Sequence, residues 1–182
     1  MLRYSIDFSW GIVKLRLPGS KEVGRYLRYA QRYGRVLVCE RVFNETTKKL
    51  WDISVEAALA AGIKSAYVIR SMAEETIQRF VKFAAKRRIS DDTSSVPILT
   101  KLFLEIWTDP SKQAKKERWA KIKTKHVDDG PPGGPDIVIL STAVKQQEKS
   151  QTEVLTFDHD LIVFEEEIEQ ATHVRVKNAW KL

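Results

Sequence analysis

The pattern of apolar and polar residues predicts several β-strands spread along the chain. "RYSIDF" (3–8) alternates polar and apolar side chains and is rich in strand-forming residues. "RVLVC" (35–39) is a continuous apolar run, which is typical of a strand buried on both faces of a parallel sheet. Near the end of the chain, "TEVLTF" (152–157) and "HVRVKN" (173–178) have the composition of two further strands.

Apolar residues at helical spacing predict helices between these strands. One helix is expected to begin after Ser20 and end before Gly34, and a longer one covers 40–61. A third, "DHDLIVFEEEIEQA", follows the strand at 152–157. "DIVILSTAVKQQ" (136–147) fits either a buried strand or a helix that faces the core. Because strands and helices alternate at both ends of the chain, we predict an α/β fold with a parallel sheet.

Residues 63–130 interrupt this alternation. After a short expected strand, "AYVIR", the next segment has the clearest helical pattern in the chain, with Ser71 and Glu74 as a capping box. The later segment "SKQAKKERWAKIKTK" is also predicted to be a helix. Its apolar stripe is narrow, and we assign Trp119 on that stripe to the core rather than to base stacking. We therefore predict one domain over 1–182, in which 63–130 is a mostly helical, basic insertion.

Composition excludes several classes of protein. The 182 residues are 43% hydrophobic, which excludes wholesale disorder. No run of about 18 apolar residues is present, so no membrane-spanning helix is expected. Cys39 is the only cysteine, which excludes an internal disulfide and a CxxC metal knuckle. Since the start of the chain lacks the pattern of a signal peptide, we expect a cytoplasmic protein.

Charge is distributed unevenly along the chain. The net charge is +7, and residues 78–126 alone hold thirteen Lys or Arg against five Asp or Glu. Residues 127–182 hold eleven acidic and five basic residues. A basic block beside an acidic one suits a polyanionic partner, although a solvated helical face would look the same. The residues expected to contact such a partner are Arg87, Arg88, Lys112, Lys115, Lys116, Arg118, Lys121, Lys123 and Lys125.

Four acidic residues lie at or just beyond the ends of predicted elements. They are Asp7, Glu45, Asp136 and Asp158. In an open parallel sheet, sites form beyond the carboxyl ends of the strands, so the fold can bring these residues together. Clustered carboxylates repel one another unless a cation neutralises them, and ligands that are all oxygen select Mg²⁺ or Mn²⁺. The sequence therefore predicts a site for a hard divalent cation.

Each of these acids also has a purely structural interpretation. Asp158 or its neighbour Asp160 can cap the helix that begins there, and Asp136 can do the same for the segment that follows it. Glu45 can complement a helix dipole. Asp7 is the hardest to explain structurally, because it lies inside an apolar strand pattern where an unpaired carboxylate is costly.

The ordered set of acidic motifs resembles the PIN-domain nucleases. The motifs are "SIDFS" with Asp7 and Ser9, "VFNE" with Glu45, "DIVILSTA" with Asp136, and "TFDHDL" with Thr156, Asp158 and Asp160. The resemblance covers 3–62 and 136–178, about half of the chain. A rival alignment puts the first acid in "VLVCERVF" and the second at Glu74 or Glu75. It would place Cys39 where an Asp is required, and it would leave the first strand unused. The resemblance implies a PIN-like parallel sheet flanked by helices, with an inserted helical subdomain.

The resemblance also implies a chemistry, that of an endoribonuclease dependent on Mg²⁺ or Mn²⁺. In such an enzyme a metal-bound water attacks the phosphorus of an RNA phosphodiester. The expected metal ligands are Asp7, Asp136, Asp158 and Asp160. Glu45 would be a ligand or would orient the water, while Ser9 and Thr156 would hold carboxylates through hydrogen bonds. His159 is a candidate base, although exposure or helix capping is the commoner role for such a histidine.

The substrate and the partners follow from the resemblance alone. The helical insertion is similar to that of the small protein-only ribonuclease P group, which implies 5′ processing of precursor tRNA. That group tends to carry a second Asp one turn after the third acid, where this chain has Leu140. The alternatives are a toxin-type PIN ribonuclease with an antitoxin partner and a non-catalytic RNA-binding module. We further expect a homo-oligomer without membrane contact.

Overall fold

The computed structural model describes residues 3–6 (backbone only), 28, 32, 34–124, 126–127, 130–131, 133–156, 158–178 and 181. Three of the predicted site residues, Asp7, Ser9 and Lys125, lie outside the described residues. So does most of the helix expected after Ser20.

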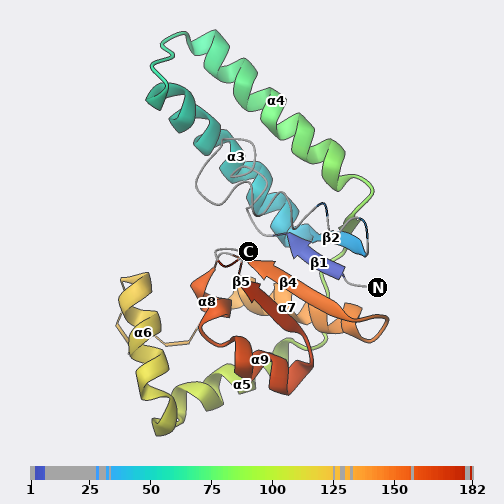
Figure 1. Cartoon of the computed structure of the whole chain (residues 1–182), viewed down its shortest axis with the longest axis vertical. Helices are drawn as coiled ribbons and strands as arrows, with labels where there is room; N and C mark the ends of the chain where they lie inside the picture. Colours follow the sequence, from blue (N-terminus) through green and yellow to red (C-terminus); the bar gives the residue numbers. More distant parts are fainter. Residues whose placement is uncertain are drawn as a thin grey trace.

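Five short strands among the described residues pair in parallel (Figure 1). Their order across the hydrogen-bonded ladders is β3-β2-β1-β4-β5. Since all the strands run the same way, their carboxyl ends lie at one edge, where α3 follows β2 and Asp158 follows β4. The bounds are β1 (Arg3–Ile6), β2 (Arg35–Cys39), β3 (Arg88–Ile89), β4 (Thr152–Thr156) and β5 (Arg175–Asn178).

Helices form the larger part of the described chain. The two longest, α3 and α4, pack against each other as an antiparallel hairpin that projects from the rest of the molecule (Figure 1). α7 packs on β4 and on α5. The bounds are α3 (Glu40–Ala60), α4 (Ala66–Ala84), α5 (Val96–Thr108), the 3₁₀ helix η1 (Pro110–Lys112), α6 (Gln113–Lys123), α7 (Gly134–Gln147), α8 (His159–Ile162) and α9 (Glu165–Thr172).

The predicted fold class, a PIN-like parallel sheet flanked by helices with an inserted helical subdomain, is wrong. The structure is mostly helical, and its parallel strands are only two to five residues long. By contrast, α3 has 21 residues and α4 has 19. A helix satisfies its backbone hydrogen bonds internally, whereas a strand needs a partner for every residue it adds. The packing of α3 on α4 therefore lets both helices extend well beyond the short strands.

Two local predictions are also settled by the structure. "AYVIR" is not a strand, because residues 66–70 are the first turns of α4. The helix is capped by Ser65, whose hydroxyl accepts a hydrogen bond from the Val68 N–H at 3.4 Å, so the expected capping box at Ser71 and Glu74 lies inside the helix. "DIVILSTAVKQQ", which fitted a strand or a helix, forms most of α7.

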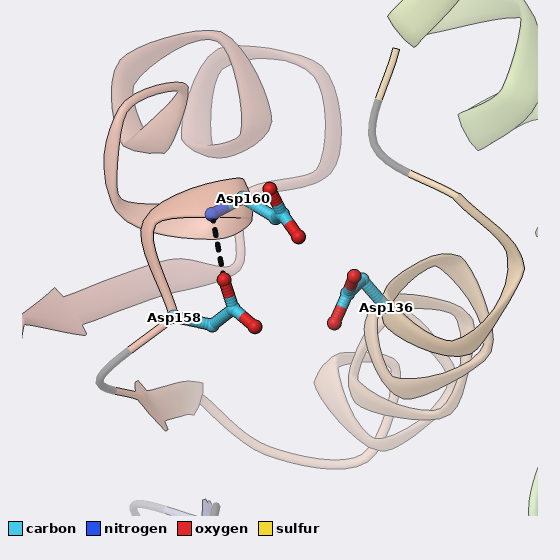
Figure 2. Close-up of side chains that lie close together, drawn as sticks. All are labelled: Asp136, Asp158 and Asp160. Carbon is cyan, nitrogen blue, oxygen red and sulfur yellow. Dashed lines mark hydrogen bonds between the residues drawn. The ribbon is translucent and has the colours of Figure 1, made fainter. Parts of the chain in front are cut away.

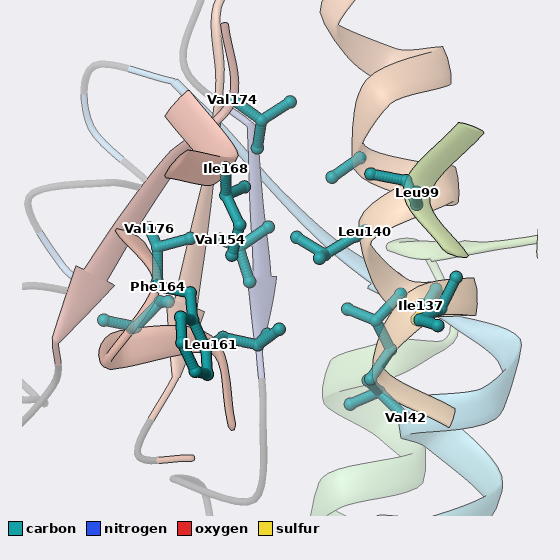
Figure 3. Packing of buried hydrophobic residues seen from close by; sticks show 14 of the residues in the cluster. Val42, Leu99, Ile137, Leu140, Val154, Leu161, Phe164, Ile168, Val174 and Val176 are labelled. Carbon is teal, nitrogen blue, oxygen red and sulfur yellow. The ribbon is translucent and has the colours of Figure 1, made fainter. Parts of the chain in front are cut away.

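The hydrophobic core lies between α7 and the strands (Figure 3). Leu140 of α7 points toward Val154 of β4, and Phe164 and Ile168 close the other side. A second part of the core is aromatic. Trp119 is 1% exposed and meets Trp107 edge to face, with 5.0 Å between ring centroids, so its assignment to the core is confirmed. None of the described helices is both long and apolar enough to cross a membrane.

Candidate metal centre

Three aspartates from two neighbouring elements converge at the carboxyl end of β4 (Figure 2). Asp136 is in the first turn of α7, while Asp158 and Asp160 flank the start of α8. One carboxylate oxygen of each residue lies within 4.8 Å of the corresponding oxygens of the other two. Three negative charges at this separation repel one another, and a cation bound among them removes that cost. We call these three residues the aspartate cluster.

The turn between β4 and α8 is built by hydrogen bonds to Asp158. The Thr156 hydroxyl oxygen accepts from the Asp158 N–H at 2.8 Å, and Asp158 Oδ1 accepts from the Asp160 N–H at 2.9 Å. Asp158 is thus the N-cap of α8, as one structural interpretation held, and the same turn aims it at the other acids. Through this hydrogen bond to backbone, Thr156 shapes the turn.

Asp136 reaches the cluster from the third position of α7. The N-cap of that helix is Gly133, so Asp136 is not the cap. It is instead a first-turn acid, whose charge complements the positive end of the helix dipole. Pro135, at the second position, suits a helix start because it has no N–H to satisfy there.

A lysine from α6 lies directly on the aspartate cluster. Lys123 Nζ is 2.8 Å from Asp158 Oδ1 and 2.8 Å from Asp160 Oδ2. One turn earlier, Trp119 Nε1 donates a hydrogen bond to Asp160 Oδ1 at 2.6 Å. Lys123 was predicted to contact RNA, but in the structure it neutralises two of the three acids.

These contacts shift the proton affinity of both partners. Partial burial acts to raise the pKa of Asp158, but the Asp160 amide and the Lys123 ammonium outweigh it and lower that pKa. Burial likewise acts to lower the pKa of Lys123, and the hydrogen bonds and charges of the two aspartates raise it overall. At neutral pH, Asp158 is therefore ionised and Lys123 protonated.

Glu45 lies apart from the aspartate cluster. Its carboxylate is on the exposed side of α3 and forms an ion pair with Lys49, one turn later. It nevertheless lines the same cavity as Asp136 and Asp158. Glu45 thus lines the cavity without belonging to the aspartate cluster.

The aspartate cluster opens into a cavity of about 840 Å³. Asp136, Asp158 and His159 line it, and α3 contributes Arg41, Glu45 and Lys48. This volume is in the range of ligand-binding sites. The sequence analysis missed Arg41 and Lys48. Their signal is their spacing, since they lie four residues before and three residues after Glu45 and so share its helical face.

Most of the predicted RNA-contacting residues of α6 are engaged inside the molecule. Lys112 and Lys115 each approach the buried Glu167 carboxylate at 2.9 Å, and Lys115 also meets Glu166 at 2.6 Å. Lys116 is only 5% exposed, and its ammonium donates to the carbonyls of Trp107 and Asp109. Lys112 of η1 and Lys115 of α6 therefore form ion pairs with the acidic α9, and the signal for this was the glutamate run 165–167.

Of the other residues predicted to contact RNA, two arginines are held by contacts within the protein, and two residues of α6 are exposed. The Arg87 guanidinium donates to the Phe83 carbonyl at 2.6 Å, and its Cζ lies 4.3 Å from the centroid of the Phe83 ring. Arg88 pairs with Glu40 and lies over the ring of Phe43. Arg118 and Lys121 are exposed on α6.

Comparison with known proteins does not place the chain in a family. No protein-family model matches the chain, and searches of curated proteins and of solved structures likewise found no match. The function must therefore be argued from the aspartate cluster and the cavity around it.

Proposed function

We propose that the protein is a metal-dependent endoribonuclease in which the aspartate cluster holds Mg²⁺ or Mn²⁺. The observation that supports this is the convergence of Asp136, Asp158 and Asp160, with carboxylate oxygens within 4.8 Å of one another. Oxygen ligands around one Mg²⁺ lie about 3–4 Å apart, given Mg–O distances of about 2.1 Å. Small side-chain rotations would bring the three carboxylate oxygens from their present separation, within 4.8 Å, to the spacing of ligands around one ion. The donor set therefore fits a hard divalent cation.

Residues around the cluster have distinct roles in this proposal. When bound, the cation supplies a water of lowered pKa and neutralises charge on the phosphate. Asp136, Asp158 and Asp160 would hold it, and the cap hydrogen bond of Asp158 keeps that carboxylate oriented. Glu45, which lines the same cavity, would orient the attacking water or accept its proton. Lys123 must leave the two aspartates or share them with the cation.

Several parts of this proposal rest on sequence resemblance alone. An RNA substrate follows from the likeness of the acidic motifs to PIN-domain nucleases, and 5′ processing of precursor tRNA follows from the looser likeness of the helical insertion. Asp7 and Ser9 as further members of the site, a homo-oligomer, an antitoxin partner under the toxin-type alternative, and a cytoplasmic location stay predictions.

Charge-only substitutions test the cluster directly. Asp136→Asn and Asp158→Asn should each lower cleavage of a labelled RNA in Mg²⁺ by more than about 100-fold, because outer-shell partners alone cost about 10–100-fold. Asp52→Asn is the matched control, since Asp52 is exposed on α3 and does not line the cavity. Cleavage that survives in both cluster variants, or that persists in EDTA, would refute the proposal.

One observation favours a second candidate, a non-catalytic RNA-binding module. Lys123 already neutralises Asp158 and Asp160, so the cluster can serve as an internal ion pair that fastens α6 to α8. In that case Mg²⁺ and Mn²⁺ would leave the melting temperature of the wild type unchanged. A metal site would instead raise it, because a ligand that binds only the folded state stabilises that state.

A further inference from the structure

The cavity beside the aspartate cluster has a cationic wall on α3. Arg41, Asn44, Glu45 and Lys48 all line the cavity, and their spacing of three, four and seven residues places them on one helical face. Val42, which also lines the cavity, and Leu50, on the opposite face of the helix, are buried in the core. Core packing therefore holds this face of α3 toward the cavity.

The positive charges of this wall are available to a ligand. Arg41 and Lys48 are both exposed, and among the described residues no ion pair involves either side chain. The Arg41 backbone is anchored, because its N–H donates to Asp91 Oδ1 at 3.0 Å. Lys49 differs, since its ammonium is paired with Glu45. Two cations, about two turns apart on α3, thus line the cavity.

The basic residues of α6 present a contrast. Lys115 and Lys123 are paired with carboxylates, and the Lys116 ammonium donates to backbone carbonyls. A phosphate would have to displace those partners before it could bind. The paired lysines of this basic segment are therefore poorly suited to hold the substrate, and its exposed Arg118 and Lys121 do not line the cavity.

The cavity is lined by the α3 cations and by carboxylates that can hold a divalent metal, with Lys123 paired to one of these carboxylates. A phosphodiester matches both, because its oxygens accept from Arg and Lys while coordinating a cation. We propose that Arg41 and Lys48 contact the backbone phosphates of a single RNA strand lying in this cavity, and that α6 does not supply this contact. This inference rests on the proposed function, since it takes RNA as the ligand of the site.

The spacing of the two residues sets the number of phosphates involved. Seven residues of helix separate Arg41 from Lys48, a rise of about 10 Å along the axis. At that separation they meet different phosphates of the strand. For single strands, each phosphate contact contributes about 0.7 to the slope of log affinity against log salt. Loss of both contacts should make the slope shallower by about 1.4, equivalent to about 25-fold weaker binding at 0.1 M salt.

Two double variants with equal change in charge test the inference. Arg41→Gln/Lys48→Gln removes the α3 cations, and Arg118→Gln/Lys121→Gln removes two exposed cations of α6. Binding of a fluorescently labelled single-stranded RNA would be measured by anisotropy between 50 and about 300 mM salt in EDTA, which prevents metal-dependent cleavage. All four residues are exposed, so both variants should fold, as thermal melting would check. We expect the α3 variant to bind about 25-fold more weakly at 0.1 M salt, and the α6 variant to bind like wild type.

The outcomes separate this inference from the proposed function. Weakened binding in the α6 variant together with unchanged binding in the α3 variant overturns the inference, even if the wild type cleaves RNA. Binding that depends on Arg41 and Lys48 without any cleavage by the wild type in Mg²⁺ supports the inference and refutes the nuclease proposal. If the wild type does not bind RNA at all, both are refuted.

Discussion

Replacement of Lys123 by Met tests whether a divalent cation and this ammonium compete for the same carboxylates. Lys123 meets Asp158 and Asp160 at 2.8 Å each, and the three side chains are partly buried, at 23%, 34% and 12% exposed. A metal ion bound by both aspartates must give up or weaken these two contacts. Met keeps the length and apolar stem of the side chain and removes only the charge and its hydrogen bonds.

The expected magnitude follows from the two contacts that the metal displaces. Charge-assisted hydrogen bonds at such partly exposed carboxylates are together worth about 1–2 kcal/mol. Since about 1.4 kcal/mol corresponds to a tenfold change in affinity, Lys123→Met should bind Mn²⁺ about 5- to 30-fold more tightly than the wild type. Without metal the same variant should be less stable by about 1–2 kcal/mol, because the aspartates then repel one another without compensation.

Calorimetric titration with Mn²⁺ measures the affinity, and thermal melting with and without Mn²⁺ measures the stability. The matched control is Lys121→Met, which removes one charge from the exposed face of the same helix and so reports any long-range effect. Equal Mn²⁺ affinities for the wild type and both variants would show that the metal, if it binds, does not use Asp158 and Asp160. A loss of affinity in Lys123→Met would show that the lysine organises the site rather than competing for it.

Two further predictions concern the contacts that hold α6. Burial acts to raise the pKa of Glu167, but hydrogen bonds and charges from Lys112 and Lys115 lower it overall. The stability that the ionised Glu167 contributes to the fold is therefore complete above its unfolded pKa near 4.3. It is lost as the pH falls through the lower pKa of the folded state. Glu167→Gln should therefore lower the free energy of unfolding by about 1–3 kcal/mol at pH 7 and by much less near pH 3 in urea titrations, whereas the exposed Glu169→Gln should change little at either pH. Lys116→Met leaves the Trp107 and Asp109 carbonyls without their buried donor, so it should lower the free energy of unfolding by about 1–3 kcal/mol. The RNA affinity should be unchanged. Weakened RNA binding by a stable Lys116→Met protein would contradict the structural role.

Local sequence pattern was sufficient for several elements of the fold. Arg35–Cys39 is a strand where a continuous apolar run predicted one, Thr152–Thr156 lies within the strand predicted at 152–157, and α3 follows the first of these as its apolar spacing indicated. The pattern also placed Asp158 and Asp160 directly after the predicted strand that became β4, at the carboxyl end of the strands, where a site was expected. Hydrophobic periodicity and strand direction are local properties, so the sequence alone carries them.

The choice between strand and helix for "DIVILSTAVKQQ" required the tertiary structure. Its residues are apolar on nearly every side, which suits both a doubly buried strand and a buried helix. Packing against α5 and β4 settled it as α7, and this placed Asp136 in a first helical turn. The predominance of helix over the short parallel strands was likewise decided by how α3 and α4 pack on each other.

The partners of the charges were decided only by the tertiary structure. The sequence shows that residues 78–126 are basic, but not which carboxylates face them. In the structure Lys115 lies on the acidic α9 and Lys123 on Asp158, while Arg41 and Lys48, from a segment without a strong charge excess, face the cavity. Charge along a chain gives sign and amount, whereas the energy of an ion pair depends on separation and burial, which distant elements acquire only when they pack together.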